Sequence, residues 1–165
     1  MTAPLTVDIT IATKEWQRLL PDAEAVARRA AEAAWRSLGP TSGAAEISIL
    51  LADDETVRQL NKRHRRLDRP TNVLSFPLDT AAPAGGPPTM LGDVVLASGV
   101  VAREAATQGK AVGAHISHLI VHGVLHLLGY DHETDPEAET MEALEVRTLA
   151  DLGIPNPYRY REAAE

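Results

Sequence analysis

The chain of 165 residues contains no cysteine. Disulfide frameworks, thiolate metal ligands and cysteine nucleophiles are therefore excluded, and any metal ion has to bind histidine, carboxylate or water. No run approaches the length of about 18 consecutive apolar residues that a membrane span needs. The first residues, MTAPLTVDITIATKEW, include neither a basic leader nor an apolar signal core. We therefore predict a soluble, cytoplasmic protein that does not contact a membrane.

Aromatic residues are also scarce, with two tryptophans, three tyrosines and one phenylalanine. We expect Trp16 and Trp35 to pack in the core, as most tryptophans do, rather than to bind a ligand. The formal net charge of −7 argues against indiscriminate binding to nucleic acid, although a local basic patch can outweigh the total. With 44% apolar residues the chain can fill one core, so we predict a single domain, residues 1–165.

The periodicity of the apolar residues, the content of β-favouring residues and the capping residues together predict four strands and five helices. The predicted strands are 5–12, 45–53, 71–79 and 91–98. The predicted helices are 22–39, 53–67, 98–109, 110–128 and 135–153, with Asp53 or Asp54, Ser98 and Asp135 as caps. The segment DTAAPAGGPPT, 79–89, is predicted to be a mobile loop. This order of elements predicts an α+β fold, with a mixed four-stranded sheet and helices mainly on one side.

Four of the six histidines lie within fifteen residues, HLIVHGVLHLLGYDH, 118–132. At about 100° per residue, His115, His118, His122 and His126 share one helix face, and the other positions are apolar nearly all round. Such a helix is buried, and buried imidazoles need partners for their ring nitrogens. A metal ion would supply such partners.

Gly129 indicates which histidines bind the ion. It stands three residues after His126 and can adopt the left-handed conformation that ends a helix, so the chain turns back and His132 can meet His122 and His126. Three imidazoles with an open fourth position suit Zn²⁺, one per chain, although nickel, copper or cobalt also accept nitrogen ligands. We expect His115 and His118 to lie outside this triad, and their roles stay open.

The spacing also matches HExxHxxGxxH, the pattern of zinc proteases, except that Gly123 stands at the glutamate position. That glutamate is the general base of those enzymes, and loss of such a base costs about 10²–10⁴-fold in rate. An ordinary metalloprotease is therefore disfavoured.

HGVLHLLGYDH, together with LNKRHRRLDRPTNVLSFP and LGDVVLAS, closely resembles the YbeY endoribonuclease family over nearly the whole chain. The resemblance implies a zincin-like site on a buried helix in the C-terminal half, with zinc on His122, His126 and His132. It implies hydrolysis of single-stranded RNA, maturation of the 3′ end of small-subunit (16S) ribosomal RNA and ribosome quality control. It also makes Arg65 the candidate catalytic arginine, while His64 replaces the family's usual tyrosine.

A run of basic residues around Arg65 fits an RNA substrate, because arginine can grip a phosphate with two hydrogen bonds. Within it we expect Arg65 to stabilise charge on the phosphate, and Arg63, Arg66 and Arg69 to bind substrate. The full run is Arg58, Lys62, Arg63, Arg65, Arg66 and Arg69, with one acid, Asp68. Ribosomal or ribosome-associated proteins are further candidate partners.

Several roles stay open at the level of sequence. The base could be a carboxylate elsewhere, a histidine outside the triad, a hydroxide on the metal or the 2′ hydroxyl of the RNA. Asp131 could orient His132 or its turn, and Asp93 could support a metal ligand or simply end a strand. Two alternative functions are a metal-dependent hydrolase of peptides or other substrates, and a non-catalytic ribosome-assembly factor with a structural zinc. The open coordination position argues against the second, because structural zinc usually has four protein ligands.

Overall fold

The computed structural model describes residues 3–38, 43–78 and 88–158, so most of the predicted mobile loop lies outside the described residues. Four strands form one sheet in the order β1-β2-β4-β3. They are β1 Leu5–Ile11, β2 Ala45–Ala52, β3 Val73–Pro77 and β4 Thr89–Ala97. β1, β2 and β4 run parallel, and β3 is antiparallel to β4. The predicted α+β fold with a mixed four-stranded sheet is confirmed.

Six helices accompany the sheet in the described part of the chain. They are α1 Glu15–Leu19, α2 Ala23–Arg36, α3 Asp54–Arg65, α4 Ser98–Gln108, α5 Val112–Leu127 and α6 Asp135–Asp151. The sequence pattern did not predict α1, because five residues are too short to show a helical period. None of the helices within residues 3–38, 43–78 and 88–158 is long and apolar enough to cross a membrane.

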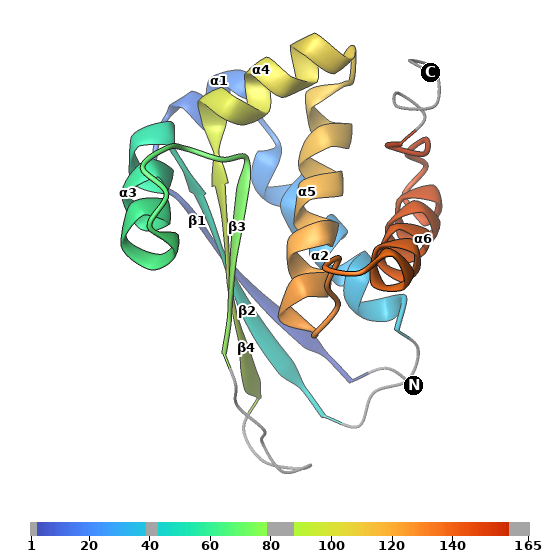
Figure 1. Cartoon of the computed structure of the whole chain (residues 1–165). Coiled ribbons are helices and arrows are strands. Elements are labelled where there is room, and N and C mark those ends of the chain that lie inside the picture. The colour runs from blue at the N-terminus through green and yellow to red at the C-terminus, as the bar shows by residue number, and fades with distance from the viewer. Residues whose placement is uncertain (1–2, 39–42, 79–87, 159–165) are drawn as a thin grey trace.

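The helices form two unequal layers on the sheet (Figure 1). α2 and α5 cover one face, where the larger core lies, and α6 packs on these two helices. α3 covers the other face, where Val57 joins a smaller cluster with Leu74 and Val95. The prediction that the helices gather mainly on one side is therefore confirmed, with α3 as the exception.

The two tryptophans lie in the core, as expected. Trp16 is fully buried and its Nε1 donates to the carbonyl of Ala52 at 2.8 Å. Trp35 is also buried, and its Nε1 donates to the carbonyl of Ala3 at 2.7 Å. Each indole thus buries a large apolar surface while its single donor is satisfied.

One of the predicted helix caps is confirmed and two are wrong. The carboxylate of Asp53 accepts from the backbone N–H of Thr56 at 2.8 Å, as a cap should. Ser98 instead is the first residue of α4, and its hydroxyl donates to the carboxylate of Glu15 at 2.5 Å. α6 is capped by Thr134 rather than Asp135, because Asp135 already has helical geometry at the first position.

Candidate metal centre

The metal centre lies where α5 ends. A Schellman motif closes the helix: the N–H of Tyr130 bonds to the carbonyl of Leu125 at 3.0 Å, and that of Gly129 to the carbonyl of His126 at 3.1 Å. Gly129 has φ +100°, the left-handed backbone that was expected of it. The chain therefore reverses direction within three residues of His126 and carries His132 back over the end of the helix.

This reversal brings the three predicted ligands together. One ring nitrogen each from His122, His126 and His132 lies within 4.8 Å of the other two, so the group could hold a metal ion. The Nε2 atoms of His122 and His126 are 3.1 Å apart. Burial, and then the neighbouring His122 and His132, lower the pKa of His126, which favours the neutral imidazole that a metal ion needs. Three imidazole nitrogen donors at this spacing fit a Zn²⁺-type ion.

Gly123 lies on the side of α5 that faces the sheet. A Cβ atom built on it would lie 2.8 Å from Cγ1 of Val94 and 3.3 Å from Oγ of Ser75. The helix therefore approaches β4 and β3 so closely that no side chain fits at this position. The glutamate of the protease pattern is excluded here by packing as well as by sequence.

A cavity of about 650 Å³ opens over the histidines and reaches across β3 to the end of α3. Its lining includes the three histidines and Arg65, whose Nη2 donates to the carbonyl of Ser75 at 3.3 Å. The predicted metal ligands and the predicted catalytic arginine thus face one space. Asn72, Tyr130, Asp131 and Glu133 also line it.

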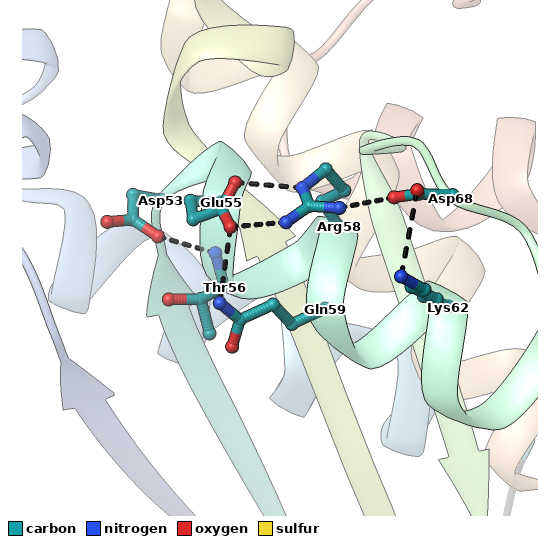
Figure 2. Close-up of polar contacts among 7 residues, drawn as sticks. All are labelled: Asp53, Glu55, Thr56, Arg58, Gln59, Lys62 and Asp68. Carbon is teal, nitrogen blue, oxygen red and sulfur yellow. Dashed lines mark hydrogen bonds and ion pairs between the residues drawn. The ribbon is translucent and has the colours of Figure 1, made fainter.

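The basic run on α3 divides into two groups. Arg58 forms ion pairs with Glu55 and Asp68, and Lys62 lies 3.9 Å from Asp68 (Figure 2). The hydrogen bonds from Arg58 and Gln59 lower the pKa of Glu55 to about 2. Two of the six basic residues thus already face acids. The predicted substrate residues belong to the second group, and are exposed beyond or at the end of α3: Arg63, Arg66 and Arg69.

His64, which stands where the family has a tyrosine, packs its ring against Phe76 of β3, with the ring centroids 5.0 Å apart. Asp131 accepts from the backbone N–H of His132 at 2.8 Å, so it holds the turn that carries this ligand, which is one of the two roles left open for it. Asp93 pairs with Ser48 and Phe76 in the sheet. Among the residues that the structure describes, no contact gives Asp93 a chemical role.

The two remaining histidines of α5 lie outside the triad, as expected. His115 is buried and its Nε2 lies 2.9 Å from a carboxylate oxygen of Glu104. Burial lowers the pKa of His115. Nε2 of His118 lies 3.3 Å from the hydroxyl of Tyr158 and 3.7 Å from the carboxylate of Glu145.

Comparison with known proteins places this arrangement in a family. The family described as Endoribonuclease YbeY matches residues 8–153. The chain belongs to this family. Three similar proteins, each named Endoribonuclease YbeY, are 50% identical to it. The relative from Rhodopseudomonas palustris (strain BisB5) aligns over 92% of this chain and 80% of its own length. For Bradyrhizobium sp. the shares are 95% and 94%, and for Paramagnetospirillum magneticum 96% and 98%.

A solved structure supports the fold of this YbeY-family chain. The solution structure of TM1509 from Thermotoga maritima aligns over 89% of this chain and 91% of its own, with a TM-score of 0.53 and 21% identity. The likeness concerns the fold alone. Membership of the family supports an endoribonuclease role, and the histidine triad is compatible with a metal-dependent nuclease.

The sequence reasoning missed Glu145, which contacts a predicted ligand of this family member. Its carboxylate is fully buried and accepts a hydrogen bond from Nδ1 of His122. Burial would raise the pKa of Glu145, but hydrogen bonds from His118, His122 and Tyr158 outweigh it and lower the pKa to about 2. A signal was present in the sequence, because Glu145 lies on the buried face of α6 between Met141 and Leu149.

Proposed function

We propose that this protein is a zinc-dependent endoribonuclease that cleaves single-stranded RNA, acting in the cytoplasm as a single domain on the 3′ end of 16S ribosomal RNA and in ribosome quality control. Its proposed partners are ribosomal RNA, as the substrate, and ribosomal or ribosome-associated proteins. The observation that carries the proposal is the shared cavity, where a triad of nitrogen donors faces Arg65. The ribosomal role rests on the resemblance to the family.

In this proposal His122, His126 and His132 hold Zn²⁺. The ion supplies Lewis acidity, which activates water and polarises a phosphoryl oxygen. Arg65 stabilises the charge that grows on the phosphate, and the bond from its Nη2 to Ser75 sets its direction before substrate arrives. Arg63, Arg66 and Arg69 contact the backbone of the RNA on either side. Because salt screens such contacts, their effect falls as ionic strength rises.

The proton acceptor does not stand at position 123, because Gly123 leaves no room for a side chain there. Asp131 and Glu133 are the carboxylates that line the cavity, and Asp131 is already engaged by the backbone of His132. Two nucleophiles are open to this site, water and the 2′ hydroxyl of the RNA, and either one gives its proton to such an acceptor. The ends of the products separate these nucleophiles, since attack by a 2′ hydroxyl leaves a 2′,3′-cyclic phosphate and attack by water does not.

β3, the edge strand that borders the cavity, argues against a peptide substrate. The carbonyl of Asn72 and the N–H of Leu78 bond towards β4, so by alternation Val73, Ser75 and Pro77 present their backbone groups outward. A peptide that added a strand here would pair with these groups. The N–H of Val73 already bonds to the side chain of Asn72, the carbonyl of Ser75 accepts from Arg65, and Pro77 has no N–H.

The test is cleavage of a labelled single-stranded RNA by zinc-loaded protein freed of contaminating nucleases, beside a folded His122→Ala/His126→Ala variant. We expect cleavage by the wild type alone, and no digestion of an unstructured protein. Equal cleavage by both forms would refute a role for the triad. Binding of zinc and RNA by the wild type without cleavage, even with ribosomal subunits present, would favour the assembly factor instead.

A further inference from the structure

Glu145 is the one fully buried acid among the residues that the structure describes. It projects from the middle of α6, the helix that packs against α5. A buried carboxylate costs several kcal/mol unless its oxygens are paired, so its partners say why it is tolerated. Each oxygen of Glu145 has a specific partner.

One oxygen faces the metal centre and the other faces the C-terminal part of the described chain. Oε1 accepts from Nδ1 of His122. Oε2 accepts from the hydroxyl of Tyr158 and lies 3.7 Å from Nε2 of His118. These contacts hold the carboxylate in one orientation, and the member of the triad that it hydrogen-bonds is His122.

The contact fixes the proton of His122. An ionised carboxylate only accepts hydrogen bonds, so the proton of the neutral imidazole must be on Nδ1. The lone pair is then on Nε2, the atom that lies 3.1 Å from Nε2 of His126. Which ring nitrogen binds a metal is set by the hydrogen bond that the other makes, and a carboxylate there also raises the basicity of the ligand.

We propose that Glu145 is the positioning residue of the metal centre, because it holds His122 in the Nδ1–H tautomer with Nε2 directed at the ion. This inference rests on the metal site in the proposed function. It also assigns α6 a part in the site, since α6 carries Glu145. The competing interpretation is a purely structural contact that holds α6 against α5.

Two substitutions separate these interpretations. Glu145→Gln keeps the shape of the side chain and removes its charge. Glu104→Gln is the matched control, because Glu104 also pairs with a histidine of the same helix, His115, which lies outside the triad and meets Glu104 through Nε2. Zinc affinity of each folded protein is measured by competition with a chelator. In parallel, long-range ¹⁵N NMR of the metal-free wild type, at a pH where the imidazole is neutral, identifies the tautomer of His122.

We expect the Nδ1–H tautomer for His122, zinc binding about 10–100-fold weaker in Glu145→Gln, and wild-type affinity in Glu104→Gln. Wild-type affinity in Glu145→Gln, or an equal loss in both variants, would overturn the proposal. A proton on Nε2 of His122 would do so as well, even if Glu145→Gln failed to fold. Failure of the proposed nuclease function would look different. In that case zinc would still bind the wild type more tightly than Glu145→Gln, but the zinc-loaded wild type would leave RNA intact.

Discussion

The contact between Gly123 and Val94 makes a quantitative prediction for stability. A methyl group at position 123 would sit 2.8 Å from Cγ1 of Val94, closer than carbon atoms pack, and neither β4 nor α5 can move without disturbing the core. Overpacking of this kind costs about 1–3 kcal/mol. Alanine recovers up to about 1 kcal/mol over glycine inside a helix. We therefore expect Gly123→Ala to lower the free energy of unfolding by about 1 kcal/mol, a balance of these two effects.

Shortening Val94 should turn the destabilising effect of Gly123→Ala into a stabilising one. Val94→Ala by itself should cost about 2 kcal/mol, from two buried methyl groups and the space they leave. In that background the methyl group added at position 123 meets mainly Oγ of Ser75 at 3.3 Å, and it fills part of the space. Gly123→Ala should then stabilise by about 1 kcal/mol. The two changes are therefore coupled by about 2 kcal/mol, within the range found for residues in contact.

Urea denaturation of the four proteins of this cycle measures the coupling, with a chelator present so that metal binding does not add to stability. The m-value must stay constant for the comparison to hold. Gly123→Ala that stabilised the wild type and the Val94→Ala background equally would refute the reasoning, since the close approach of α5 to β4 would then be absent. Gly123→Glu, which restores the protease pattern, should fold poorly and should not digest an unstructured protein.

Three further outcomes are expected. Arg65→Ala should lower the rate of RNA cleavage about 10²–10³-fold and leave zinc affinity unchanged. The control, Arg58→Ala, loses the ion pairs with Glu55 and Asp68 and should cleave at nearly the wild-type rate. Equal rates for the two variants would contradict the role of Arg65. Asp53→Ala should cost about 1 kcal/mol at neutral pH. The hydrogen bonds from the hydroxyl and N–H of Thr56 lower the pKa of Asp53. The stability that the Asp53 cap contributes should therefore be complete above about pH 4 and disappear as the pH falls through the folded-state pKa. Asp53→Asn keeps the cap and should lose this pH dependence. Finally, zinc at 100 times its dissociation constant should raise the free energy of unfolding by about 2.7 kcal/mol in the wild type, and markedly less in His126→Ala at the same concentration, as measured by thermal or urea unfolding.

The triad could be predicted because it depends on local geometry. His122 and His126 are one helical turn apart, and a single left-handed glycine brings His132 back, so a short stretch of sequence contains the information. The strands were predictable for a similar reason, since alternation in the first two and the content of apolar and β-favouring residues in the other two are local signals. α1 was missed because its five residues are too few for a period, and its place depends on the burial of Trp16 against Ala52.

The parts that could not be predicted depend on contacts across the chain. His122 and Glu145 are 23 residues apart and meet only because α6 packs back onto α5. The basic run is a similar case. Its composition suggested an open phosphate-binding face, but Glu55, one turn before Arg58, pairs with this arginine once the helix forms. Counting charges along the sequence cannot separate paired from unpaired arginines.

α5 is held from two sides, and the metal centre depends on both. On one side Gly123 lets the helix lie against β4, and on the other Glu145 of α6 fixes the ring of His122. A change in the position of α5 relative to the sheet moves His122 and His126 with the helix, whereas His132 sits beyond its end on a turn held by Asp131. Packing of the core and spacing of the ligands are therefore linked. Val94 does not line the cavity. Val94→Ala should nevertheless lower zinc affinity, measured by competition with a chelator, because α5 is no longer held against β4, and Gly123→Ala in the same background should restore it.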